Sequence, residues 1–558
     1  MALIQHRGFA ARSVPGQTDA EIATWGLPDW HRDQDALLLS LSVRRHDRDL
    51  GADEVRKLLE DDPTALAAVM PSFAAVASRP GGPTSVATDY LGFRHVFHGQ
   101  RDGRAVVSTS SRACADELGT GLDLEAVAVQ SCLGWQLGQR SLLQGVRKLA
   151  PGEIASLLDG TVAVSSFLEP RVEGPLGLDD AVRTAAEVLR SYLSAYLEDH
   201  PDAGLQLTGG QDSRLLLSAV PRSRRRGLRV VTLGVAGDPD VDIAADLAAR
   251  YGMCHELLSL DGLEALEPAA AHALCLDAAH RVDYSADPLA HAALTYAEAR
   301  SDPGPRISGL GGEVARGFYY FGRPTTAPVS PARAERLARW RMFVNESVPV
   351  EILDPFFGPW ARDFGTSEVV RVLEETRLPW LAATDELYLA HRMQRWGGVT
   401  ETAVCLDREV VNPMLDDRFI GIATALDPLD KRNSRFLSRL QLELDAELGS
   451  LPLDGRPPPA AYARRSMRNS ARQTAATTQK ARRKVVQRLR RESRPPAGGE
   501  ILAAKLVTHW RDDPSPLKPL DDLGVFRPGW LDAVVSGEET PGVSAAALVV
   551  NLLGAVTR

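Results

Sequence analysis

The chain has 558 residues, of which 44% are hydrophobic and 25% charged, and its formal net charge is −9. This balance is typical of a soluble globular protein of several domains, and the excess of acidic residues argues against wholesale nucleic-acid binding. No apolar run reaches the ~20 residues of a membrane span, the N-terminus lacks the apolar centre of a signal peptide, and five scattered cysteines indicate neither a disulfide framework nor a zinc site. We therefore expect a protein of the reducing cytoplasm.

Residues 72–98 alternate between apolar and polar side chains. Such alternation predicts short strands joined by tight turns. Cysteine and asparagine first appear late in the chain: residue 2 is alanine, the first cysteine is Cys114 and the first asparagine is Asn345. We expect the cysteines to be small buried hydrophobes and not nucleophiles.

Residues 205–218 predict a strand, a glycine turn and a helix. The strand spans 204–207, Gly209 and Gly210 form the turn, and the helix begins at Gln211. Glycine allows positive φ and close approach of a ligand to the backbone, and a helix N-terminus favours a phosphate. Asp212 would repel a bare phosphate, so a bridging Mg²⁺ is required. The alternative is an ordinary strand–turn–helix connection.

The next elements repeat the same order of strand and helix. Arg229–Gly234 is strand-like, Asp238–Tyr251 forms a turn and an amphipathic helix, and a further short strand begins at His255. This βαβα order predicts a parallel sheet with ligand at the carboxyl ends of its strands. The acidic run Asp238, Asp240 and Asp242 is more typical of a solvated loop and helix N-terminus than of a metal site.

The loop Thr208-Gly-Gly-Gln-Asp-Ser213 resembles the PP-loop, Ser-Gly-Gly-x-Asp-Ser, of ATP pyrophosphatases and of asparagine synthetases in particular. The resemblance implies that ATP is split into AMP and pyrophosphate to activate a carboxylate. Arg214, where a second serine is usual, would add a cation beside the polyphosphate. Leu233 and Gly234 would lie against adenine. The ATP-binding residues implied are Leu207, Thr208, Gly209, Gly210, Asp212, Ser213, Leu233, Gly234, Ser308, Gly309, Gly311 and Gly312.

A second glycine-rich block, 307–320, resembles that family's Ser-Gly-Glu-Gly-Ala-Asp-Glu-Leu-Phe-Gly-Gly-Tyr. Glu313 stands where the family has a Mg²⁺-binding Asp, so Asp212 and Glu313 are the implied metal ligands. Leu310 replaces a Glu associated with handling ammonia. Leucine cannot carry a proton, and this departure favours a nucleophile other than ammonia.

Residues 407–419 resemble the family's Glu-x-Arg-x-Pro-Phe-Leu-Asp, with Glu409 in register. The family then places a pyrophosphate-contacting Lys about fifteen residues on, which Lys431, followed by Arg435, matches. We therefore predict that Lys431 and Arg435 stabilise pyrophosphate and that Glu409 orients or deprotonates an amine. The alternative is that Lys431 and Arg432 simply face solvent.

The strands at 72–98, together with Gly145–Gly152, resemble the glutaminase half of asparagine synthetase. The resemblance implies an α/β fold: an N-terminal α-β-β-α glutaminase-like domain followed by a parallel-sheet PP-loop synthetase domain. Because the N-terminal Cys nucleophile and the oxyanion-hole Asn are missing, this domain does not hydrolyse glutamine by that mechanism. The expected domains are an inactive glutaminase-like unit (1–172), the synthetase-like ATP-binding unit (173–455), a basic linker or helix (456–500) and a C-terminal helical segment (501–558).

The segment 464–494 is strongly basic and holds one acidic residue, Glu492. It predicts a solvated helix or, alternatively, an electropositive arm for a precursor peptide, a carrier protein or a membrane surface. Val543–Val556 predicts a buried terminal helix.

These observations favour an ATP- and Mg²⁺-dependent ligase that adenylates a carboxylate for attack by an amine already present in the substrate. The Cys-lacking relatives that do this are β-lactam synthetases and lasso peptide cyclases, so the expected substrate is a small molecule or a peptide of natural-product biosynthesis. Two alternatives remain: an amidotransferase or asparagine synthetase supplied with ammonia, and a non-catalytic scaffold.

Overall fold

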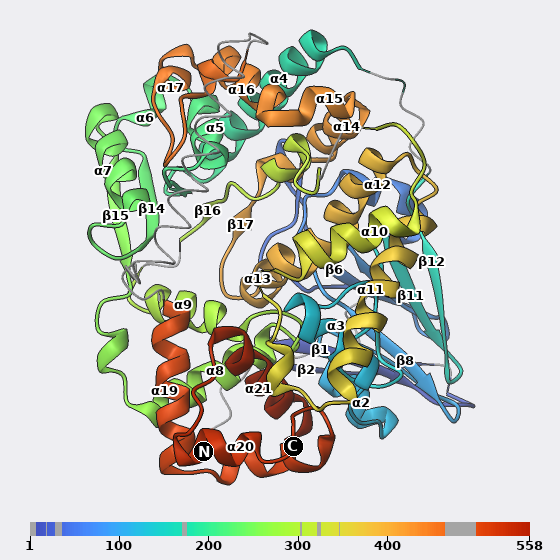
Figure 1. Cartoon of the computed structure of the whole chain (residues 1–558). Coiled ribbons are helices and arrows are strands. Elements are labelled where there is room, and N and C mark those ends of the chain that lie inside the picture. The colour runs from blue at the N-terminus through green and yellow to red at the C-terminus, as the bar shows by residue number, and fades with distance from the viewer. Residues whose placement is uncertain are drawn as a thin grey trace.

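The computed structural model describes residues 7–557 except 18, 28–35, 170–173, 175, 302–303, 321–324, 345 and 464–497. The basic segment 464–494 lies outside the described residues, so its predicted role is not addressed by the fold. Figure 1 shows the two sheet systems of the chain side by side, with the C-terminal helices beside both.

The N-terminal part contains two five-stranded antiparallel sheets that pack face to face. In the first the strand order is β10-β8-β9-β1-β2, and in the second it is β12-β11-β7-β6-β3. The strands of the first sheet are Arg147–Lys148, Phe97–Arg101, Arg104–Ser108, Gly8–Ser13 and Glu21–Trp25; those of the second are Thr161–Ser166, Glu153–Leu158, Thr84–Thr88, Ala74–Ser78 and Ala36–Leu38.

Helices cover the outer faces of this pair of sheets. Helix α1 (Ala52–Asp61) packs on β6 and β3, and α2 (Ser111–Leu118) packs on β8 and β9. Alternate residues of facing strands, such as Phe9, Val76 and Val107, are fully buried between the sheets because successive side chains point to opposite faces. The predicted α-β-β-α architecture is confirmed, and the strands predicted within 72–98 are β6, β7 and the start of β8.

The second part is built on a parallel sheet in the order β15-β14-β13-β16-β17. Its strands are Cys254–Ser259, Arg229–Gly234, Gly204–Gln206, Arg306–Ile307 and Val410–Val411. The chain runs outward from β13 to β15 and then returns to the other side of β13. The strand order therefore reverses between β13 and β16, and ligands of open α/β sheets bind outside the carboxyl ends of the strands at such a point. The predicted parallel sheet is confirmed.

Helices surround this sheet and join it to the N-terminal part. The helices are α3 (Leu124–Leu133), α4 (Leu178–Asp199), α5 (Gln211–Ala219), α6 (Arg222–Arg225), α7 (Pro239–Tyr251), α8 (Pro268–Arg281), α9 (Pro288–Glu298), α10 (Pro331–Leu337), α11 (Phe357–Glu375), α12 (Trp380–Leu387), α13 (Gly398–Val404), α14 (Asp417–Ala425), α15 (Pro428–Lys431), α16 (Arg435–Leu444) and α17 (Ala446–Ser450). One continuous apolar core includes Phe73 of the N-terminal part and Leu205 of the parallel sheet. The two parts therefore share a core.

The C-terminal helices are α19 (Gly498–Asp512), α20 (Trp530–Ser536) and α21 (Val543–Val556). Helices α19 and α21 pack on α8, as Figure 1 shows in red beside green. Helix α21 is buried along most of its length, which confirms the predicted terminal helix. Within the described ranges, no helix combines the length and apolar character needed to cross a membrane.

Candidate active site

The first glycine loop follows β13 and leads into α5. Its shape is held by the two hydroxyls predicted there: the Ser213 Oγ accepts from the Thr208 N–H at 3.1 Å, and the Thr208 Oγ1 accepts from the Gly210 N–H at 3.1 Å. Helix α5 begins with Gly210 as its N-cap and has no side-chain cap. The first backbone N–H groups of α5 therefore point into the space beyond β13, as an anion-binding loop requires.

Glycine is needed in this loop for close packing. It is not needed for a positive φ, which the sequence had suggested. Gly210 has φ −70°, and Gly209 is not among the residues of positive φ. A Cβ on Gly209 would lie 2.8 Å from the Asp240 Oδ1, which also accepts from the Gly209 N–H at 2.9 Å. Asp240 of the acidic run thus locks the loop to the start of α7. Asp238, the N-cap of α7, accepts from the Asp240 N–H.

The second glycine loop follows β16 and lies directly on the first. A Cβ on Gly309 would approach the Ser213 nitrogen to 3.0 Å, and one on Gly312 would lie 2.3 Å from the Asp212 Oδ1. Gly311 has φ +108°, a conformation that L-residues avoid, and turns the chain into a short 3₁₀ helix, Gly312–Arg316. The two motifs, a hundred residues apart in the chain, therefore meet at the point where the strand order reverses.

Asp212, Glu313 and Arg316 form a partly buried charged cluster where the loops meet. The Arg316 Nη2 lies 2.6 Å from the Glu313 Oε1 and 3.2 Å from the Asp212 Oδ2. The other oxygens of the two carboxylates, Asp212 Oδ1 and Glu313 Oε2, are buried and have no hydrogen-bond partner among the described residues. Burial raises the pKa of Asp212 to about 7, Arg316 offsets part of this rise, and Glu313 adds to it.

This cluster fits a divalent cation. Hard cations such as Mg²⁺ bind carboxylate oxygens, and two carboxylates that retain a buried, unpartnered oxygen each are a suitable donor set. Arg316 currently neutralises one charge of the pair. Because a guanidinium and a metal ion would compete for the same two carboxylates, Arg316 would weaken the binding of a metal ion by this pair.

Replacing Arg316 with alanine is expected to strengthen Mn²⁺ binding in the absence of nucleotide by about tenfold, the equivalent of ~1.4 kcal/mol. The measurement is titration of the full chain with Mn²⁺, followed by electron paramagnetic resonance. Arg371→Ala is the matched control, because Arg371 pairs with Glu368 and Glu375 on the surface of α11. Weaker Mn²⁺ binding by Arg316→Ala than by the wild type would contradict this account of the cluster.

Lys431 is buried and paired, and does not face solvent. Its Nζ donates to the Asp385 Oδ2 at 2.8 Å, and the Tyr320 Oη donates to the same oxygen at 2.8 Å. Tyr320 ends the second glycine block, Asp385 lies on α12 and Lys431 ends α15. Burial raises the pKa of Asp385, while Lys431 and Tyr320 oppose that rise. The solvent-facing alternative for Lys431 is therefore wrong.

A cavity of about 490 Å³ is lined by Lys431 and Asp385 and also by Val314. Val314 follows Glu313 in the 3₁₀ helix. Tyr388 lies beside the charged cluster, and burial followed by the charge of Glu313 raises its pKa. The structure thus brings Lys431 to the region of the predicted ATP-binding loops.

Glu409 does not reach this region. It precedes β17, whose residues Val410 and Val411 pair in register with Arg306 and Ile307 of β16. Glu409 therefore lies at the amino ends of the strands, while the glycine loops leave the carboxyl ends. Its Oε1 accepts from the Tyr196 Oη at 2.8 Å. The predicted role of Glu409 with the amine has no support in this geometry, because parallel strands place position 409 at the opposite edge of the sheet.

Arg214 and Arg435 are both held by neighbouring groups of the fold. The Arg214 guanidinium is buried and donates to the carbonyls of Leu451 and Pro452, at 3.0 and 2.6 Å, beyond the end of α17. The Arg214 side chain therefore stabilises the packing of the fold. It does not extend toward the first glycine loop, contrary to the expectation that it adds a cation beside the polyphosphate. Arg435 begins α16 and pairs with Asp430.

The segment after α17 covers the first glycine loop. The Asp454 N–H donates to the Gly209 carbonyl at 3.0 Å, and the charge of Arg456 acts on Asp212.

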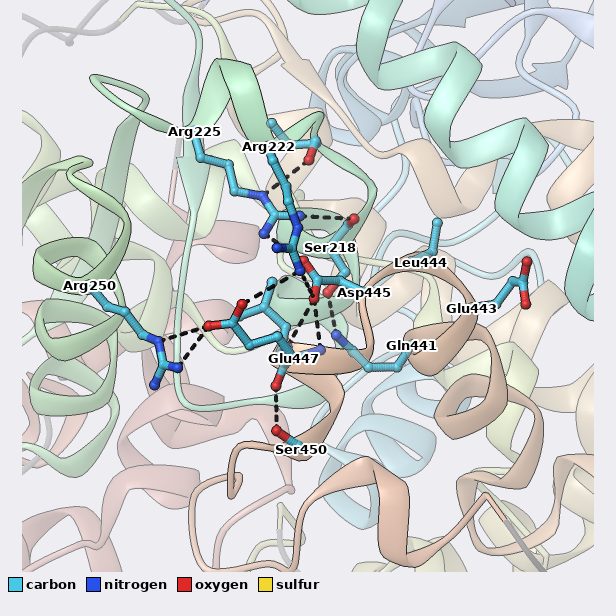
Figure 2. Close-up of polar contacts among 12 residues, drawn as sticks. Ser218, Arg222, Arg225, Arg250, Gln441, Glu443, Leu444, Asp445, Glu447 and Ser450 are labelled. Carbon is cyan, nitrogen blue, oxygen red and sulfur yellow. Dashed lines mark hydrogen bonds and ion pairs between the residues drawn. The ribbon is translucent and has the colours of Figure 1, made fainter.

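A buried ion-pair network anchors this segment after α17 (Figure 2). In it the Asp445 carboxylate pairs with Arg225 at 2.7 Å and with Arg222 at 3.0 Å. Burial opposes ionisation of Asp445, but hydrogen bonds from Arg225, the Leu448 N–H and Arg222 lower its pKa.

Asp445→Ala is expected to lower the free energy of unfolding by about 3–5 kcal/mol, because it leaves the buried Arg225 unpaired. Since the pKa of Asp445 is lowered on folding, its stabilisation is present above the unfolded pKa of about 3.9 and is lost as the pH falls below it. Calorimetry from pH 7 to pH 3 should show that the difference in free energy of unfolding between the wild type and the variant becomes smaller in acid. Glu443→Ala is the control, since the Glu443 side chain points away from the network (Figure 2). A deficit independent of pH would contradict the assignment.

Four residues near the site were not predicted from the sequence: Arg316, Tyr320, Asp385 and Arg456. Arg316 and Tyr320 belong to the second glycine-rich block, 307–320. The opposite charge of Arg316, three residues after Glu313, could have indicated their ion pair. Asp385 is 65 residues from Tyr320 and 46 from Lys431. Nothing local distinguishes it from other helical acids.

The two cysteines among the described residues of the N-terminal part, Cys114 and Cys132, are both buried, and neither is suited to nucleophilic attack. Cys114 is fully buried, and burial raises the pKa of its thiol well above the ordinary value. Burial likewise raises the pKa of Cys132 to about 11. Of the five cysteines, Cys254 is exposed, so the expectation that all five are buried is wrong for this one.

Residues 184–325 match the family model of asparagine synthase. This segment is similar to an asparagine synthase domain. It contains both glycine loops, with Asp212, Glu313, Arg316 and Tyr320. Asp385 and Lys431 lie beyond the matched residues of the asparagine synthase domain, and the fold brings them back to it.

No curated protein matches the chain. Among solved structures, glutamine phosphoribosylpyrophosphate amidotransferase from B. subtilis, complexed with ADP and GMP, matches 45% of this chain at 12% identity and a TM-score of 0.19, over 59% of its own length. A structure described as the allosteric regulatory enzyme of purine biosynthesis matches 45% at 13% identity, over 74% of its length, with the same TM-score. The chain thus aligns with less than two thirds of the first of these proteins. At a TM-score of 0.19, neither superposition bears on the properties of this chain.

Proposed function

We propose that this protein is an ATP-dependent carbon–nitrogen ligase that joins a carboxylate to an amine through an acyl-adenylate, releasing pyrophosphate and then AMP. The observation that carries the proposal is the meeting of the two glycine loops, where Asp212 and Glu313 each keep a buried oxygen that no described residue hydrogen-bonds. An anion-binding helix start beside a divalent-cation donor set suits a nucleotide polyphosphate. The asparagine synthase domain supports the same class of reaction.

In this proposal the loop amides of α5 and the hydroxyls of Thr208 and Ser213 bind the phosphates, and Leu233 and Gly234 contact adenine. Leu233 is 42% exposed at the carboxyl end of β14, so its apolar surface is open to a ring. Bound Mg²⁺ would be held by Asp212 and Glu313 and would neutralise charge on the polyphosphate. Lys431, together with Arg435 as predicted, supplies positive charge for the leaving pyrophosphate.

The second step needs a base, and Asp385 suits it better than Glu409 does. The carboxylate of the substrate first attacks the α-phosphorus, and pyrophosphate leaves. The amine then attacks the acyl carbon, the bond to the AMP oxygen breaks, and the amine gives up a proton. Asp385 lines the cavity, and its burial raises its pKa toward that of a useful acceptor. Tyr320 and Lys431 hold the carboxylate in place.

The substrate that we propose carries its own amine, as in lasso peptide macrocyclisation or other natural-product biosynthesis. Leu310 in place of an acid, and the absence of an accessible nucleophilic cysteine in the described N-terminal part, both support an amine whose source is not glutamine. A precursor peptide or carrier protein contacting the basic segment 464–494 remains part of the proposal.

ATP–pyrophosphate exchange tests the proposal. The full chain with Mg²⁺ is incubated with aspartate, free amino-carboxylates, and peptides bearing an internal Asp or Glu. Exchange with one class, and not without it, supports adenylation and names the substrate type. Product that forms only with added ammonium would instead favour an ammonia-dependent amidotransferase, and the absence of ATP·Mg²⁺ binding would favour a non-catalytic scaffold.

A further inference from the structure

The cavity beside Lys431 lies between the N-terminal part and helical segments of the second part. Tyr90, Leu91 and Pro151 come from the N-terminal part, while Ala382 and Leu389 come from α12 and the π-helical segment that follows it, Tyr388–Gly397. Its volume is about 490 Å³. That is within the range of pockets that bind small organic ligands, roughly 300–1,000 Å³.

The walls of this cavity are mainly apolar. Apolar side chains contributed by separate segments of the chain form most of the lining, and the larger ones are Leu91, Leu168, Val314, Leu378, Leu389 and Leu426. Two of the polar groups are directed into the fold: the Tyr90 Oη donates to the Leu415 carbonyl at 2.6 Å, and the Thr424 Oγ1 donates to the Ile420 carbonyl at 2.9 Å. A ligand here would therefore present apolar surface to most of the cavity.

The charged groups of the lining are unequal in sign. Three carboxylates, Glu169, Asp385 and Glu386, line the cavity with one ammonium, Lys431. Lys431 is paired with Asp385, and Glu169 is exposed at the rim. Among the described lining residues, Glu169 therefore adds a negative charge at the mouth of the cavity, and this charge favours a cationic group over an anionic one.

We infer that this cavity binds the amine-bearing half of the substrate, a primary amine carried on an apolar body of several carbon atoms. Ammonia needs no more room than one water molecule, which has a share of about 30 Å³ in the liquid, and the cavity is more than ten times larger. The inference rests on the proposed ligase function and deepens it, because it names the chemistry of the nucleophile and where it binds.

Calorimetric titration of the full chain with n-alkylamines, from ethylamine to octylamine without ATP, tests this inference. Affinity is expected to rise about fourfold for each added methylene until the cavity is filled. The n-alcohol of equal length is expected to bind more weakly, because it lacks the charge. Equal affinity of amine and alcohol, or no dependence on chain length, would overturn the inference.

Two variants locate the binding. Ala382→Trp fills the cavity and should abolish amine binding, whereas Ala249→Trp, on the exposed face of α7, should leave it unchanged. Glu169→Gln should weaken amine binding about two- to fivefold at low salt and leave alcohol binding unchanged. Its matched control is Glu187→Gln, on the exposed face of α4. Amine binding that survives Ala382→Trp would overturn the inference, and Glu169→Gln tests the charge without altering the packing.

Failure of this inference and failure of the proposed function are separable. Amine binding needs no ATP, and ATP–pyrophosphate exchange needs only a carboxylate and ATP. Exchange without cavity-dependent amine binding would overturn the inference and keep the ligase, whereas amine binding at this cavity without any exchange would count against the ligase alone.

Discussion

Asp212→Asn is expected to lower the rate of ATP–pyrophosphate exchange by at least about 100-fold. Asparagine has almost the same shape, so the packing against Gly312, where the side chain lies within 2.3 Å of the Cβ position, is kept. The substitution removes one of the two carboxylates proposed to hold Mg²⁺ opposite the α5 N-terminus. The loss should therefore appear in the exchange rate and in the Mg²⁺ dependence of ATP binding, measured by titration.

Asp242→Asn is the control for this experiment. Asp242 is an exposed acid in the first turn of α7, so its substitution makes the same chemical change outside the cluster. The melting temperature of both variants, measured by calorimetry, separates a catalytic loss from unfolding. An Asp212→Asn protein that exchanges pyrophosphate at the rate of the Asp242→Asn protein would remove Asp212 from the proposed metal site.

The second large effect is expected for Lys431→Met, which should lower the exchange rate by about 100-fold or more. Lys431 is only 2% exposed, and its ammonium is proposed to neutralise charge on the leaving pyrophosphate. The variant also leaves Asp385 buried without its cation, so stability should fall by about 3–5 kcal/mol. Thermal unfolding and exchange, measured on the same preparation, report the two effects.

A double variant distinguishes the catalytic from the structural effect. In Lys431→Met with Asp385→Leu, the buried pair is replaced by apolar groups, which is often neutral for stability. We expect the double variant to regain most of the lost stability and none of the exchange activity. Activity that returned together with stability would show that Lys431 only supports the fold.

Features carried by a contiguous run of residues could be predicted from the sequence. The β13–α5 loop depends on neighbours, with Thr208 and Ser213 bonding within five residues of each other, and the order of strands and helices that follows it dictates a parallel sheet. The terminal helix α21 likewise follows from an apolar run long enough to be buried. In each case the physical cause is local backbone preference or local hydrophobic patterning, which the order of residues specifies.

Contacts between distant segments were decided by the tertiary structure. Arg214 stands beside the loop in sequence, yet its partners lie 237 and 238 residues away, at Leu451 and Pro452. Glu409 matches a motif, but the register of β17 places it at the amino ends of the strands, away from the glycine loops at the carboxyl ends. Asp385 gained its place beside Tyr320 and Lys431 because burial leaves a carboxylate stable only where donors converge on it. Such convergence depends on how the helices pack, and a linear sequence does not display it.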